Sequence, residues 1–214
     1  MTEVPSLTIA IALYDRMTML DAIGPYQVLT WLPGAEVVLC AAARGTITDD
    51  KGLFRFDVEH AFDDVGSPDV VVVPGGFVTR NMAVAGNPLV EWVRSVHPTT
   101  TFTTSVCTGS LILAAAGVLD GLDATTHWLA YDELAALGAC PTEERVVVRG
   151  KVITGAGVSA GIDMALRLVI EMAGVEVAQA IQLGIEYDPQ PPTDAGSPTK
   201  APAAIRNLVE AINR

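Results

Sequence analysis

Short apolar runs alternate along this chain with longer segments whose apolar residues recur at helical spacing. Val70–Val73 is a run of four valines that leads into Pro74-Gly75-Gly76, which is typical of a buried strand ending in a tight turn. The same pattern predicts strands at 7–13, 36–42 and 99–106, and a hairpin with arms at 145–148 and 151–154. Helices are predicted at 21–32, 88–96, 110–116, 162–173, 176–185 and 203–212.

Continuous apolar strands that alternate with helices predict an α/β fold. We expect a mostly parallel sheet with helices on both faces and an antiparallel hairpin at one edge. One domain is expected, with a proline-rich C-terminal extension from about residue 189. Ligands bind such sheets at the carboxyl ends of the strands. The segment 14–21, the Pro74-Gly75-Gly76 turn and the turn at Cys107 should therefore converge.

Composition and charge narrow the function classes. The chain has 214 residues, of which 50% are hydrophobic, and a formal net charge of −12. This composition excludes disorder, and the scattered basic residues disfavour nucleic acid and anionic membranes as partners. The N-terminus lacks the positive start of a secretory signal, and no apolar run reaches the roughly 18 residues of a membrane span. We expect a cytoplasmic protein.

The three cysteines differ in their surroundings. They cannot all pair within one chain and show no C-x-x-C spacing, so free thiols in a reducing compartment are expected. Cys107 follows a β-branched strand and precedes a helix, as a nucleophile elbow does, although the G-x-S-x-G pattern is absent. A helix N-terminus should lower its pKa from about 8.5. It is equally open that Cys107 is a small buried apolar residue without a chemical role. Cys40 and Cys140 are expected to serve only in the packing of the fold.

Asp21 is the favoured proton partner of such a thiol. It ends the first strand-to-helix loop, and its strand is a plausible neighbour of the strand before Cys107. The alternative is that Asp21 caps the helix N-terminus, a position that aspartate favours. The three histidines, His60, His97 and His127, are expected to be structural or solvated.

The glycine-rich segment Gly155-Ala156-Gly157 resembles a dinucleotide loop only superficially. It falls late in the chain, and no acidic partner follows at the roughly 20-residue spacing of a Rossmann fold. No cluster of Cys, His, Asp or Glu has metal-ligand spacing. We therefore expect neither a cofactor nor a metal.

Several strings resemble the isocyanide hydratase branch of the ThiJ/PfpI superfamily, within the class I glutamine amidotransferase-like fold. The resemblance covers nearly the whole chain and is most specific at 105–111, 115–119 and 124–128. It implies a flavodoxin-like three-layer sandwich and a homodimer. It also implies cofactor-independent hydration of a small uncharged organic isocyanide to an N-substituted formamide.

The resemblance also implies roles for individual residues. Cys107 would form a covalent thioimidate, and Asp21 would act as general acid–base. The Thr108 hydroxyl would hold the thiolate or serve only as a residue of the first helical turn. Backbone N–H groups of Gly75, Gly76 and Thr108 would stabilise the tetrahedral species. Val158 stands where the branch has isoleucine, which suggests a slightly different pocket wall.

Of four alternative functions, two stay open and two are disfavoured. A glyoxalase-like or other cysteine-dependent enzyme of the superfamily would also use a cysteine with a nearby carboxylic acid. A peptidase is disfavoured because Thr108, and not histidine, follows the cysteine. A ligand or dimerisation module, as in AraC-type regulators, is disfavoured by the acidic balance. A redox sensor would depend on oxidation of an exposed, low-pKa Cys107.

Overall fold

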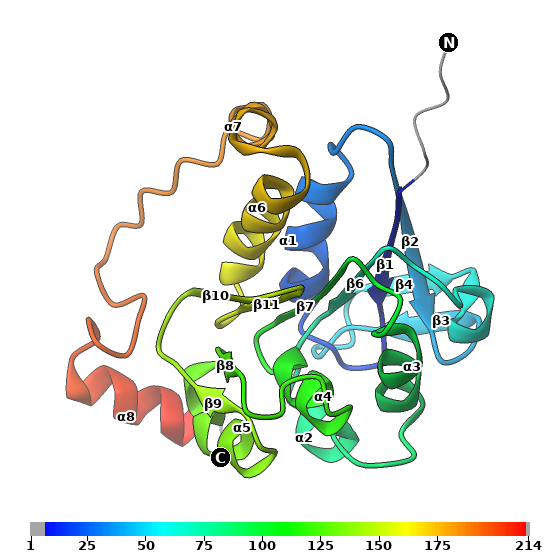
Figure 1. Ribbon diagram of the computed structural model, residues 1–214. Helices are drawn as coiled ribbons and strands as arrows, with labels where there is room; N and C mark the ends of the chain where they lie inside the picture. Colours follow the sequence, from blue (N-terminus) through cyan, green and yellow to red (C-terminus); the bar gives the residue numbers. More distant parts are fainter. Residues whose placement is uncertain (1–6, 213–214) are drawn as a thin grey trace.

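A seven-stranded sheet forms the centre of the molecule (Figure 1). The computed structural model describes residues 7–212. The prediction that the N-terminus is not a secretory signal concerns a segment that begins with residues 1–6, which lie outside this range. The strands run in the order β10-β11-β7-β6-β1-β2-β5, and every neighbouring pair is parallel except β10 with β11. Their bounds are β1 Leu7–Ala12, β2 Ala35–Ala41, β5 His60–Ala61, β6 Val70–Val73, β7 Phe102–Val106, β10 Val146–Arg149 and β11 Val152–Gly155. The predicted α/β class with an antiparallel edge hairpin is confirmed.

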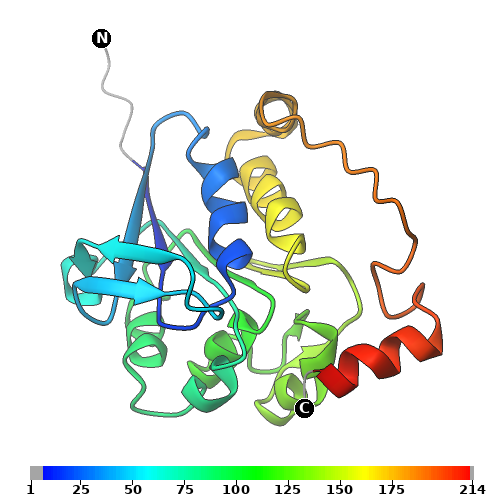
Figure 2. The same cartoon turned by 180° about the vertical axis from the view of Figure 1, so that it is seen from behind.

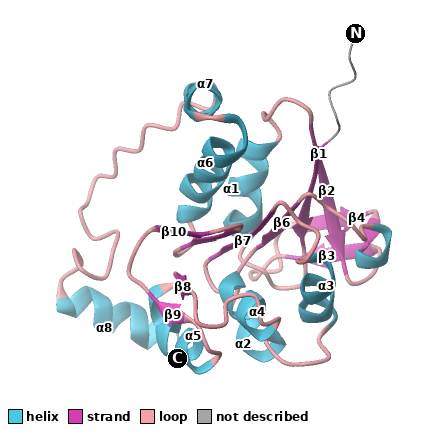
Figure 3. Ribbon diagram, in the orientation of Figure 1, coloured by secondary structure: helices cyan, strands magenta, loops and turns pink. Residues whose placement is uncertain are grey.

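Helices cover both faces of the sheet (Figures 1 and 2). One face carries α1 (Met19–Leu29) beside α6 (Ala160–Ala173), and α7 (Val175–Gly184) packs on α6. The other face carries α3 (Pro88–Val96) beside α4 (Gly109–Ala115). The remaining elements, coloured by type in Figure 3, are β3 Gly45–Thr48, β4 Arg55–Val58, η1 Phe62–Asp64, α2 Thr79–Met82, β8 Asp123–Ala124, η2 Trp128–Ala130, α5 Tyr131–Ala136, β9 Cys140–Pro141 and α8 Ala203–Ile212.

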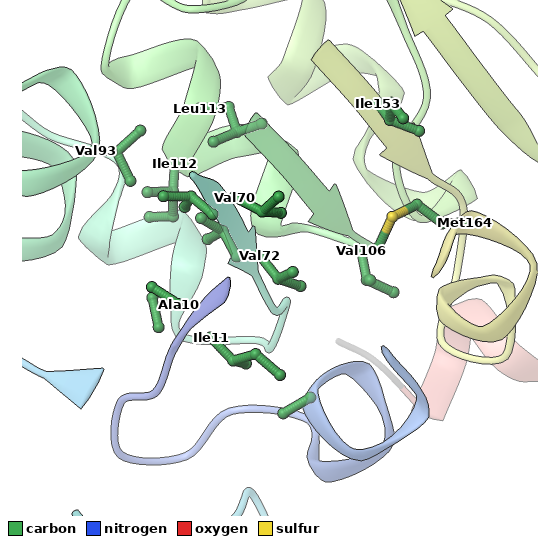
Figure 4. Close-up of a cluster of buried hydrophobic side chains, with 14 of the residues drawn as sticks. Ala10, Ile11, Val70, Val72, Val93, Val106, Ile112, Leu113, Ile153 and Met164 are labelled. Atoms are coloured by element: carbon green, nitrogen blue, oxygen red, sulfur yellow. The ribbon is translucent and has the colours of Figure 1, made fainter. Parts of the chain in front are cut away.

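The core lies on both sides of the central strands (Figure 4). All four valines of β6 are fully buried, because helices cover that strand on both faces. Ile11 of β1 and Val106 of β7 are also fully buried, so the three strands that end at the candidate site belong to the most tightly enclosed part of the sheet. The backbone that positions the site is therefore rigidly supported.

Most predicted elements agree with the structure to within a few residues, and β6 and α3 match the predicted bounds. The β7 strand begins at Phe102 and not at 99, because the N–H groups of Thr99 and Thr100 both bond back to Val96 at the end of α3. The expectation that the first strand neighbours the Cys107 strand is wrong, since β6 lies between β1 and β7. All three are parallel and still end at one edge of the sheet. Among residues 7–212, no helix is long and apolar enough to cross a membrane.

Candidate active site

Cys107 occupies the tight turn between β7 and α4. Its φ of 56° lies in the left-handed region, which a non-glycine residue seldom adopts without support from its surroundings. That support comes from both sides of the residue. Its N–H lies 3.0 Å from the carbonyl oxygens of Gly155 and Ala156, and its own carbonyl oxygen accepts from the Thr126 hydroxyl at 3.1 Å. The side chain is 5% exposed and lines a cavity at the end of the sheet.

Asp21 lies in the first turn of α1 and is fully buried. Thr18, and not Asp21, is the N-cap residue of α1, so the capping alternative for Asp21 is wrong. The carboxyl oxygen Oδ2 accepts a hydrogen bond from the Gly75 N–H at 3.0 Å. Among residues 7–212, the other oxygen, Oδ1, has no hydrogen-bond partner. A buried polar atom without a partner is uncommon and marks this carboxyl as a candidate for chemistry.

Gly75 allows the carboxyl and the thiol to meet. A Cβ at this position would lie 2.8 Å from Asp21 Oδ2, 2.8 Å from Cys107 Cβ and 2.6 Å from the Thr108 nitrogen. Any other residue would therefore wedge the two side chains apart. The carboxyl and the thiol interact directly, and each affects the pKa of the other. The structure thus brings together the two residues that the sequence singled out as nucleophile and acid–base.

Burial dominates the titration of both groups. It raises the pKa of Asp21 to about 7, although hydrogen bonds from the Gly75 N–H and the Cys107 thiol oppose the shift. Burial and the Asp21 carboxylate raise the pKa of Cys107 to about 12, against the lowering effect of the Val158 and Thr108 N–H groups. The expected low thiol pKa is wrong, because α4 has only seven residues and its N–H groups do not offset desolvation. The proton rests on the thiol at neutral pH, while Asp21 titrates.

Thr108 and the two glycines support the site through their own hydrogen bonds. The Thr108 hydroxyl donates to the Gly76 carbonyl oxygen at 3.0 Å and accepts from the Gly76 N–H at 2.9 Å, so it does not hold the thiolate. The N–H of Gly75 is occupied by Asp21. The backbone N–H groups that act on the Cys107 sulfur are those of Thr108 and Val158. Of the N–H groups expected to stabilise the tetrahedral species, those of Gly75 and Gly76 are engaged within the protein, and that of Thr108 acts on the sulfur.

The cavity above Cys107 has a volume of about 220 Å³. Phe77, Arg80, His127 and Leu129 line it, and none was predicted as a site residue. They lie in or next to α2 and η2, two short elements that the hydrophobic pattern did not predict. The string 124–128, one of those that carry the resemblance noted in the sequence, was a signal that could have drawn attention to His127. Across residues 7–212, no three His, Cys, Asp or Glu side chains are grouped closely enough to hold a metal ion.

The raised pKa of Asp21 has a consequence for stability. The folded pKa of about 7 exceeds the value near 3.9 of an unfolded chain. The protonated Asp21 therefore makes its full contribution to the free energy of unfolding below about pH 4. This contribution falls by up to about 1.4 kcal/mol per pH unit as the pH rises from there through about 7, above which it is lost. Asp21→Asn removes this dependence. Denaturant unfolding measures the difference in the free energy of unfolding between Asp21→Asn and the parent. We expect this difference to shift in favour of the variant between pH 5 and pH 8, and an equal difference at both pH values would contradict the raised pKa.

A parallel α/β sheet that carries a buried cysteine at a strained strand-to-helix turn, beside a buried acid, defines a class of protein. The chain belongs to the DJ-1/PfpI family, whose model matches residues 7–171. Isonitrile hydratase of Pseudomonas putida is 42% identical over 200 residues, which cover 94% of this chain and 87% of that protein. The crystal structure of a THiJ/PfpI family protein from Pseudomonas syringae superposes with a TM-score of 0.91 at 37% identity, covering 99% of this chain and 88% of that one. The predicted family resemblance is confirmed.

A regulator is a more distant relative. The HTH-type transcriptional regulator CdhR of Pseudomonas aeruginosa is 31% identical over 142 residues. The match covers 64% of this chain but only 41% of the regulator. Identity and coverage are both higher for the hydratase.

Proposed function

We propose that this protein hydrates an organic isocyanide to an N-substituted formamide, with Cys107 as nucleophile and Asp21 as general acid–base. The observation that carries the proposal is the contact between a buried thiol and a buried carboxyl that titrates near neutrality. General acid–base catalysis is most efficient when the pKa lies near the working pH. The 42% identity with isonitrile hydratase supports the substrate class.

The first step forms the covalent intermediate. The sulfur of Cys107 attacks the terminal carbon of the isocyanide, a site open to soft nucleophiles, and a C–S bond forms. Asp21, as carboxylate, accepts the thiol proton and passes it to the same carbon. The product is a thioimidate in which a C=N bond replaces the isocyanide triple bond. The N–H groups of Thr108 and Val158 stabilise negative charge on the sulfur during the attack.

The second step adds water to the thioimidate carbon. Asp21, again a carboxylate, accepts a proton from the attacking water and delivers it to the nitrogen. The tetrahedral species then collapses: the C–S bond breaks, the hydroxyl becomes the formyl oxygen, and its proton returns to the sulfur through Asp21. The sum is one isocyanide plus one water giving one formamide, with thiol and carboxyl restored and no cofactor used.

The cavity wall supports an uncharged substrate. Phe77, Leu129 and Val158 supply apolar surface. Two charged side chains also line the cavity, and each is paired within the protein: Arg80 with Glu133 at 2.8 Å and Asp50 with Lys51 at 3.3 Å. A neutral alkyl or aryl group on the isocyanide nitrogen fits this lining better than a charged group would.

Incubation of the purified protein with an aryl or alkyl isocyanide tests the proposal. We expect formamide to accumulate at a rate proportional to protein concentration, measured by NMR or mass spectrometry against a protein-free control. A parallel assay with methylglyoxal separates the glyoxalase-like alternative. Turnover of methylglyoxal with no formamide from any isocyanide would refute the hydratase proposal.

A further inference from the structure

His127 lies on the wall of the Cys107 cavity and also lines a second cavity of about 330 Å³ that shares this wall. It is the N-cap residue of η2. The ring packs so closely on Gly157 that a Cβ there would lie 2.8 Å from His127 Cδ2. The imidazole is therefore held in one position between η2 and the loop that precedes α6.

The hydrogen bonding of His127 fixes which ring nitrogen carries the proton. Nδ1 accepts from the Leu129 N–H at 3.3 Å. A backbone N–H can only donate, so Nδ1 carries no proton and the neutral ring has its proton on Nε2. Burial, helped by the cation of Arg80, lowers the pKa of His127, which favours this neutral form. Within the described part of the chain, the bond to Nδ1 is the hydrogen bond that the ring makes, and Nε2 faces no protein partner.

Two of the other donor groups around the cavity already have partners within the protein, whereas the Thr18 hydroxyl on the same wall is a second candidate donor. The Gly76 N–H donates to the Thr108 hydroxyl, which in turn donates to the Gly76 carbonyl oxygen. Arg80 donates from Nε to Glu133 at 2.8 Å and from Nη2 to the Leu129 carbonyl oxygen at 3.1 Å. The Nε2–H of His127 is thus a fixed donor on the cavity wall, and a molecule bound in the cavity can accept its hydrogen bond.

We propose that this partner is the substrate nitrogen, and that His127 is a further catalytic residue of the hydratase reaction. The inference rests on the proposed function. When water attacks the thioimidate carbon, negative charge develops on the adjacent nitrogen. A fixed donor on the wall of the same cavity that reaches this nitrogen stabilises the charge and needs no reorganisation during the step. His127 transfers no proton; Asp21 remains the group that moves protons.

Two substitutions at His127 separate catalysis from structure. Asparagine is a good N-cap residue and retains an acceptor for the Leu129 N–H, but it is too short to place a donor at the Nε2 position. Glutamine places an amide N–H near that position and is the poorer cap. A purely structural role therefore favours His127→Asn over His127→Gln, whereas a catalytic role favours the reverse. His60→Phe, at an exposed histidine on β5, is the control.

We expect His127→Asn to lower kcat by about 10²-fold, with a smaller effect on the rate of adduct formation. Because thioimidate hydrolysis becomes slow, acid-quenched samples should show Cys107 heavier by the mass of the isocyanide. His127→Gln should recover most of kcat and lose the adduct, and His60→Phe should match the parent. Thermal melts report the folding of each variant.

Different failures of this experiment have different meanings. If His127→Asn matches the parent, or if His127→Gln is the more impaired variant, the inference about His127 is wrong, while formamide from the parent still supports the hydratase function. Accumulation of the adduct in Thr18→Val and not in His127→Asn would assign the donor to the Thr18 hydroxyl, on the same wall, and overturn the inference. A parent protein that forms no formamide refutes the proposed function itself.

Discussion

Serine in place of Cys107 is expected to lower kcat/KM for isocyanide hydration by roughly 10⁴-fold or more. The proposed first step needs a soft nucleophile whose proton Asp21 can accept. A serine hydroxyl is a much weaker acid than a thiol, and a carboxyl with a pKa of about 7 cannot deprotonate it to any useful extent. The change removes one buried sulfur and adds a smaller oxygen, so the fold should survive. Steady-state rates over several isocyanides measure the loss.

Cys140→Ser is the matched control for this variant. Cys140 is a free, exposed cysteine in β9, away from the cavity, so its removal should leave the rate at the parent level. Mass spectrometry of quenched reactions adds a second readout in the His127→Asn background, where adduct hydrolysis is expected to be slow: the adduct should form when Cys140→Ser is added but not when Cys107→Ser is added. Undiminished hydration by a folded Cys107→Ser protein would rule out the covalent mechanism.

Alanine in place of Gly109 should destabilise the protein by about 4 kcal/mol or more, a large part of the roughly 5–15 kcal/mol by which an ordinary domain is stable. A Cβ at Gly109, the first residue of α4, would lie 2.1 Å from the Val73 carbonyl oxygen and 2.8 Å from that of Pro74. Both atoms belong to backbone at the end of β6, so no rotation of a side chain relieves the overlap. The helix would have to move away from the sheet, together with the turn that positions Cys107.

Gly66→Ala is the comparison for Gly109→Ala. Its Cβ would meet nothing within 4 Å, and its φ lies outside the left-handed region, so a change within about 0.5 kcal/mol is expected. Urea unfolding of the three proteins, or the soluble yield where Gly109→Ala does not fold, measures the difference. A Gly109→Ala protein as stable as Gly66→Ala would show that α4 shifts from β6 at little cost in free energy.

The candidate site was predictable as far as its chemistry depends on local pattern. A β-branched strand, a cysteine and a helix-forming segment follow one another at 99–116, and this order alone indicated a strand-to-helix turn at Cys107. Asp21 was found because the loops after parallel strands meet at one edge of the sheet, although the supposed contact of its strand with β7 was wrong. The meeting of the two side chains depends on the order β7-β6-β1 and on Gly75 between them.

The sequence by itself determined the α/β architecture, the family and the choice of Cys107 and Asp21. It did so because hydrophobic periodicity and short motifs are properties of neighbouring residues. Only the tertiary structure decided the protonation of the thiol, the partner of the Thr108 hydroxyl and the place of His127 on the cavity wall. Each of these depends on segments far apart in the chain. A pKa reflects how completely distant elements exclude water, and a hydroxyl bonds to whatever backbone packing brings to it, as Gly76 meets Thr108 across 32 positions of sequence.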